Sequence, residues 1–114
     1  MHILRSIISR IRQHYLKPIY TITTIKGLDP LDDTRTVGFY CDRNRAILAV
    51  HENWGDMYEC GSYPYAVIET VYEGLYSTRG ELLWYNWYKW MGDEHGGYVL
   101  IENPLPVYVG WGMG

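Results

Sequence analysis

The chain has 114 residues, 47% of them hydrophobic and 20% charged, and its formal net charge is −3. This length corresponds to one domain, and the balance of apolar and charged residues excludes a disordered chain. No apolar run reaches the roughly 18 residues of a membrane-spanning helix, and residues 1–15 lack the uninterrupted apolar stretch of a signal peptide. We therefore expect a single cytoplasmic domain over residues 1–114, with no membrane as a partner.

The N-terminal segment has the pattern of an amphipathic helix over residues 1–17. Its apolar residues recur at helical spacing, and they are Ile3, Leu4, Ile7, Ile8, Ile11 and Tyr15. The basic residues lie mostly off that stripe, and Pro18 ends the helix. A basic helix of this kind can lie on a membrane or on nucleic acid. Because it lacks Trp and Phe anchors, we expect it to pack on its own domain or on a sister subunit.

The core of the domain, residues 19–111, begins with two predicted strands. Residues 19–26 (IYTITTIK) are rich in β-branched residues and alternate in polarity, which is typical of a strand. Residues 27–33 (GLDPLDD) predict a turn or a short loop, and residues 34–40 (TRTVGFY) predict the second strand.

A helix is predicted next, over residues 43–53. Asp42 is a good N-cap for it, and the residues expected to face inward are Ala46, Ile47, Ala49 and Val50. Gly55 is expected to supply the left-handed conformation that ends the helix.

The second half of the chain predicts further strands. Residues 65–72 are almost continuously apolar, which is typical of a central strand covered on both faces. Residues 81–91 form a long aromatic strand, residues 98–102 return after a turn, and residues 107–111 are a candidate edge strand. The expected architecture is α+β: an antiparallel sheet of four to six strands with one packed helix and an extra N-terminal amphipathic helix.

No catalytic or metal-binding motif stands out. The serines lie in no GxSxG or SxxK motif, and neither Cys41 nor Cys60 has a histidine at a sequence spacing typical of a catalytic pair. Whether these two cysteines pair stays open. Glu69 lies inside an apolar strand, where we expect an ion pair with Arg35 rather than acid–base chemistry. We therefore expect no enzymatic activity, no metal and no cofactor.

The aromatic residues carry the best functional signal, with twelve Tyr and five Trp against a single Phe. Trp84 and Trp87 in the aromatic strand offer flat faces on which bases stack, and Arg35 supplies a planar cation. Arg43 and Arg45 fall in the first turn of the predicted helix, whose free N–H groups favour an anion. This combination predicts nucleotide binding, but a strand rich in Trp and Tyr is equally typical of an oligomer interface.

Charged residues are unevenly distributed along the chain. Residues 1–45 hold eight Lys/Arg against four Asp/Glu, and residues 46–114 hold two against nine. This asymmetry can create a basic patch for a phosphate-bearing partner, or it can let the two halves attract each other. Polymeric nucleic acid is disfavoured as a partner, because a net charge of −3 lacks the expected basic footprint.

Six sequence blocks within residues 19–104 resemble a family of very small bacterial and prophage proteins. In order they are RTVGFY, HENWGDMYE, YAVIE, EGLY, LWYNWY and GYVLIENP. In size and character the chain is also similar to phage anti-defence sponges of the Thoeris anti-defence family. That resemblance implies a homo-oligomer in the bacterial host cytoplasm that sequesters cyclic ADP-ribose-type or cyclic oligonucleotide signals without degrading them. It also implies an adenine held between an aromatic ring and an arginine at a subunit boundary.

The sequence therefore favours a non-enzymatic, anti-defence nucleotide-binding protein. Arg35, Arg43 and Arg45 would hold phosphates, Trp84 and Trp87 would stack bases, and Asn53 and Asp56 would bond base or ribose edges. The alternative is a protein–protein interaction module that directly inhibits a host factor through its aromatic strand and basic helix. A small hydrolase that uses Glu69, or the stretch from His51 to Glu59, ranks last.

Overall fold

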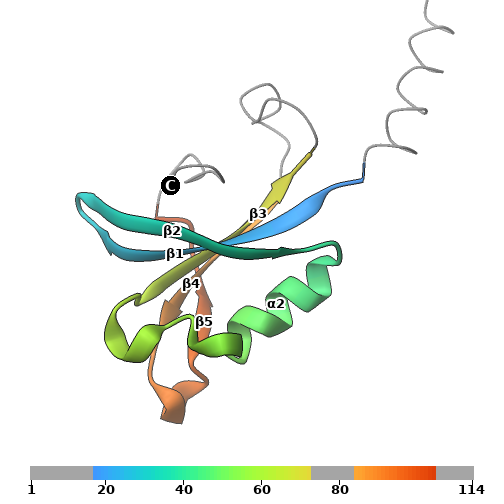
Figure 1. Cartoon of the computed structure of the whole chain (residues 1–114). Helices are drawn as coiled ribbons and strands as arrows, with labels where there is room; N and C mark the ends of the chain where they lie inside the picture. The colour runs from blue at the N-terminus through green and yellow to red at the C-terminus, as the bar shows by residue number, and fades with distance from the viewer. Residues whose placement is uncertain (1–16, 73–83, 105–114) are drawn as a thin grey trace, which may run out of the picture.

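The computed structural model describes residues 17–72 and 84–104, which form an α+β fold (Figure 1). Its centre is a five-stranded antiparallel sheet in the order β2-β1-β3-β4-β5. The elements are β1 (Ile19–Leu28), β2 (Leu31–Tyr40), α2 (Arg43–His51), β3 (Tyr65–Val71), β4 (Tyr85–Trp90) and β5 (Tyr98–Ile101). The predicted α+β class is confirmed, whereas the predicted N-terminal helix and the 107–111 strand lie outside the described residues.

The connection between β1 and β2 is much tighter than the sequence predicts. Gly27 pairs with Asp32 and Leu28 pairs with Leu31, so only Asp29 and Pro30 make the turn. The predicted turn is therefore confirmed at Asp29 and Pro30, but its predicted bounds of 27–33 are too wide, because the other residues belong to the two strands. Glycine and aspartate have low strand propensity, but here their pairing across the hairpin keeps them in the two strands.

Helix α2 forms for the reasons that the sequence indicates. The Asp42 side chain accepts a hydrogen bond from the Asn44 backbone N–H at 2.9 Å, which satisfies one of the free donors of the first turn. Its buried residues are Ala46, Ala49 and Val50, whose small side chains let the helix approach the sheet closely. The helix ends at His51 rather than at residue 53. None of the described helices is long and apolar enough to cross a membrane.

The sheet has a buried core on each face. Helix α2 lies on one face of the sheet (Figure 1). It packs there over Tyr20, Ile22, Ala66 and Ile68, together with Tyr88, Tyr98 and Met57. The opposite face holds a second cluster of Ile25, Val67 and Trp87, each fully buried. Strand β3 contributes to both cores from between β1 and β4, so the predicted central strand covered on both faces is confirmed.

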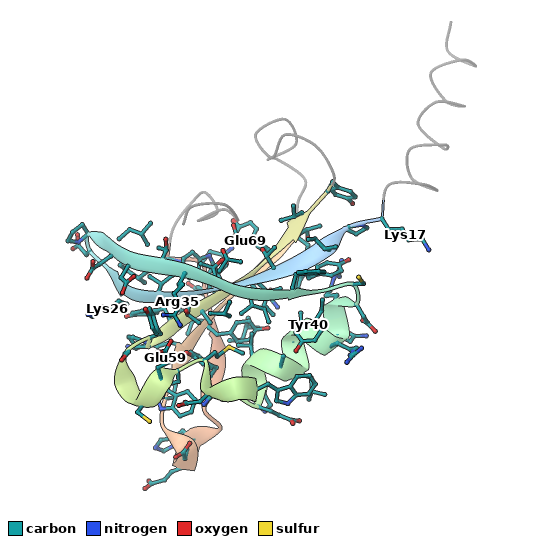
Figure 2. The ribbon with its side chains drawn as sticks, viewed as in Figure 1. Lys17, Lys26, Arg35, Tyr40, Glu59 and Glu69 are labelled. Carbon is teal, nitrogen blue, oxygen red and sulfur yellow. The ribbon has the colours of Figure 1, made fainter. Side chains whose placement is uncertain are left out.

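The expected ion pair between Glu69 and Arg35 does not form. Arg35 pairs in register with Thr24, which in turn pairs with Ala66. Glu69 lies three residues beyond Ala66 on β3, and strand side chains alternate between faces, so Glu69 and Arg35 lie on opposite faces of the sheet. The guanidinium of Arg35 instead contacts Glu59 at 2.6 Å, and Figure 2 labels these two residues near each other and Glu69 apart from them.

Candidate functional site

A groove of about 520 Å³ lies between β2 and the segment that follows α2. Its apolar floor is made by the buried side chains of Ile22 and Met57, and Gly38 lines it from β2. The two ends of the groove differ in chemistry, because Arg35 lies at one end of the β2 stretch and Tyr40 at the other (Figure 2). The volume falls in the usual range of small-molecule sites.

The wall opposite β2 is an unusual loop that continues from α2 through two short 3-10 turns, Trp54–Asp56 and Glu59–Gly61. Four of its non-glycine residues have positive φ, and they are Asn53, Asp56, Glu59 and Cys60. Left-handed backbone is unfavourable for such residues and persists only where the surroundings impose it. The Asn53 side chain is one restraint, since it accepts a hydrogen bond from the Tyr58 N–H at 2.9 Å and donates to Asp56 at 3.3 Å.

The strain in this loop can be measured at Cys60, whose side chain is exposed. Cys60 has φ of 53°, a left-handed conformation that is unfavourable for cysteine and acceptable for glycine. Cys60→Gly should therefore raise the free energy of unfolding by about 0.5–1 kcal/mol, which is the relief of that penalty minus the larger conformational entropy that glycine loses on folding. Cys41 is also exposed but has no positive φ, and Cys41→Gly should lower stability slightly. Urea titration of both variants tests this, and equal losses would show that Cys60 is unstrained.

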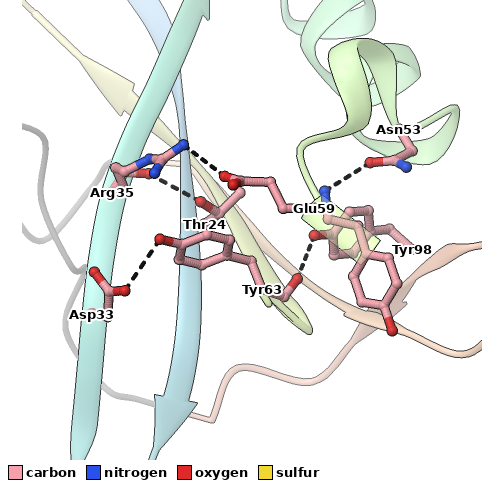
Figure 3. A network of polar contacts seen from close by, with 8 residues as sticks. Thr24, Asp33, Arg35, Asn53, Glu59, Tyr63 and Tyr98 are labelled. Carbon is pink, nitrogen blue, oxygen red and sulfur yellow. Dashed lines mark hydrogen bonds and ion pairs between the residues drawn. The ribbon is translucent and has the colours of Figure 1, made fainter. Parts of the chain in front are cut away.

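The charged end of the groove is supported by a chain of hydrogen bonds (Figure 3). The Arg35–Glu59 pair lies beside the ring of Tyr63, whose centroid is 5.3 Å from the guanidinium carbon. Tyr63 donates to Asp33 at 3.1 Å, and Tyr98 donates to the Tyr63 carbonyl at 2.6 Å. Burial, followed by the bond to Asp33, raises the pKa of Tyr63, and burial raises the pKa of Tyr98. Both phenols are hydrogen-bond donors, and their bonds join Asp33 of β2, Tyr63 and β5 beside this end of the groove.

The aromatic end of the groove is built by Tyr40 and Trp54. Their rings meet edge to face with centroids 6.0 Å apart, a favourable geometry for aromatic pairs. The Trp54 indole N–H donates to Glu52 at 3.0 Å. The guanidinium of Arg45 lies 5.5 Å from the Tyr40 ring centroid, so this end of the groove also has a cation beside it.

The structure brings some of the predicted site residues together. Arg35 and Asp56 both line the groove, and Arg45 lies at its aromatic end through Tyr40. Asn53 is half-buried and serves the loop, because both polar atoms of its side chain bond within that loop.

The other predicted residues lie away from the groove. Arg43 and Trp84 do meet, with the guanidinium 4.5 Å from the indole, but they pack beside Tyr20 at the start of α2. Trp87 is 0% exposed in the core of the opposite face. Alternation along β4 makes Trp84 and Trp87 point to different faces, so the two do not form one stacking platform, and Trp87 presents no free face for a base.

Most residues that line the groove were not predicted as site residues, among them Tyr40, Trp54 and Gly38, and Glu59 was predicted only as the end of a candidate hydrolase stretch. The run from Asn53 to Asp56 signalled a turn, but nothing local indicated that the turn folds back on β2. In the described part of the chain, no three His, Cys, Asp or Glu side chains gather as a metal site requires. A comparison with protein-family models, curated proteins and solved structures finds no match, so the functional argument rests on the groove itself.

Proposed function

We propose that the protein is a non-enzymatic binding protein that sequesters a nucleotide signal of the cyclic nucleotide or cyclic ADP-ribose type. One observation carries this proposal: a groove of about 520 Å³ has an arginine at one end and a pair of aromatic rings at the other. Such a groove offers a stacking surface for a base and a planar cation for a phosphate. The anti-defence role implied by the sequence resemblance fits this chemistry.

Arg35 is available to a ligand although it contacts Glu59. The two side chains are 55% and 40% exposed, and an exposed ion pair contributes only about 0–1 kcal/mol. A phosphate group, which presents several acceptor oxygens, can therefore replace the carboxylate on the guanidinium. Arg45 provides a second cation, and Asp56 accepts hydrogen bonds from a base or a ribose hydroxyl.

The first experiment incubates the purified protein with a panel of cyclic nucleotides and ADP-ribose derivatives and follows its melting temperature. The protein is then heat-denatured and the released molecule is identified by mass spectrometry. A ligand that raises the melting temperature and emerges intact supports sequestration. A cleaved product would establish an enzyme instead, and the absence of any shift would refute nucleotide binding.

Two substitutions at the charged end should change affinity in opposite directions. Arg35→Gln should weaken binding of the stabilising nucleotide tenfold or more, because a charge-assisted hydrogen bond contributes about 1.5–3 kcal/mol. Glu59→Gln should strengthen binding, because it removes the carboxylate that competes with the phosphate. Isothermal titration calorimetry measures both, with Arg43→Gln as the matched control outside the groove. Equal effects of Arg35→Gln and Arg43→Gln would exclude Arg35 as the phosphate ligand.

A docking module that inhibits a host protein is the second candidate. Edge strand β2 exposes Phe39 at 60% and Val37 at 40%, and exposed apolar groups of this kind favour protein contacts. A nucleotide that binds the isolated protein supports the first candidate, whereas a captured host protein without any small-molecule binding supports the second. Homo-oligomer formation stays a prediction.

A further inference from the structure

Gly38 lies in the middle of the groove, beside the β-bulge at Val37, and neither a positive φ nor a close contact requires glycine there. Its φ is not in the positive range, so its backbone suits any residue, and a Cβ added to it would have no heavy atom within 4 Å. Glycine inside a strand weakens that strand, because it gives up side-chain packing and loses more conformational entropy on folding. Glycine at this position therefore lowers the stability of the fold, and it leaves the space beside the β2 backbone unfilled.

That space has a defined position and chemistry. Gly38 pairs with Ile22, and directly opposed residues point to the same face of a sheet. The missing side chain would therefore project into the groove, over the floor made by Ile22 and Met57 and toward the Tyr40–Trp54 pair. A planar group can approach a bare backbone to ordinary van der Waals distance, whereas any larger side chain at this position would occupy the same volume.

We propose that Gly38 is the seat of the ligand's planar ring, which lies against the β2 backbone with Tyr40 and Trp54 at its edge. This inference rests on the proposed function and specifies the ligand further. Arg35 is three residues away from Gly38, but the β-bulge leaves their partners on β1, Thr24 and Ile22, only two residues apart, which is about 7 Å at roughly 3.3–3.4 Å per residue. The groove therefore selects a base that carries an anionic group at about that distance, as in a nucleotide, over a free base or a nucleoside.

The test uses the full-length protein with two probes, adenosine diphosphate and the fluorescent dye anilinonaphthalenesulfonate, which also joins flat rings to an anionic group. Gly38→Ala and Gly38→Val should leave the urea unfolding midpoint unchanged or higher, because both residues suit a strand better than glycine does. Gly38→Val should weaken both probes at least tenfold, and Gly38→Ala should weaken them less. Leu100→Val is the control, because Leu100 is 57% exposed on the edge strand β5, outside the groove; it should change neither affinity.

The possible outcomes separate this inference from the proposed function. A lower unfolding midpoint in Gly38→Val would show that the glycine serves the fold and would overturn the seat. Unchanged affinities in a stable Gly38→Val protein would overturn it as well. Binding of the dye alone, lost in Gly38→Val, would support the ring seat while contradicting nucleotide binding. Failure of the wild-type protein to bind either probe would refute the ring seat, whereas the proposed function is decided by the panel of cyclic nucleotides and ADP-ribose derivatives.

Discussion

Replacing Trp87 with alanine should lower the free energy of unfolding by about 3–5 kcal/mol, the usual cost of removing a fully buried tryptophan. Trp87 is 0% exposed and packs in the second core with Ile25 and Val67. The sequence pattern predicts a base-stacking role at this position, but the structure makes it the largest side chain of a core. Chemical denaturation followed by far-UV circular dichroism measures the loss.

Trp54→Ala is the natural control for that measurement. Trp54 is 36% exposed, and its contacts are the edge-to-face pair with Tyr40 and the bond to Glu52, so its removal should cost about 1–2 kcal/mol. Trp54→Ala should also weaken nucleotide binding, which separates a site residue from a core residue. A loss below about 1 kcal/mol for Trp87→Ala would contradict the burial of that side chain.

Gly97→Ala should destabilise the protein by about 2–4 kcal/mol, combining a backbone penalty with overpacking. Gly97 has φ of 72°, and an added Cβ would lie 3.3 Å from the Trp90 ring and 3.5 Å from the His51 carbonyl oxygen. Trp90 cannot retreat easily, because its other contacts include the Tyr58 ring, stacked at 4.0 Å.

The neighbouring glycine isolates the two contributions. Gly96 has φ of 93°, but its added Cβ would meet nothing closer than the His51 ring at 3.9 Å. Gly96→Ala should therefore carry only the backbone penalty, about 1–2 kcal/mol. Thermal or urea unfolding of the two variants gives the comparison, and an equal loss in both would show that the Trp90 contact is not strained.

Local patterns predicted the elements that local chemistry controls. Helix α2 could be identified from the cap at Asp42 and its small inward residues, and β3 from its continuous apolar run. The groove could not be identified in this way, because it depends on where a loop of left-handed residues returns to the sheet. The ion-pair partner of Arg35 could not be predicted for a similar reason. The register of β2, β1 and β3 decides which face of the sheet each side chain occupies, and it places Arg35 on the face of Glu59 and not on that of Glu69.

The groove also has a simple position in the chain. Every residue that lines it lies between Ile22 and Glu59, although the sheet continues through β4 and β5 to Ile101. Arg35 and Glu59, which meet at one end of the groove, are 24 residues apart, so the loop that closes when they meet is shorter than the one that closes when β1 pairs with β3. The hairpin and the loop that line the groove, and the helix between them, are thus contiguous in the sequence, whereas β3, β4 and β5 supply core residues on which the helix and the loop pack.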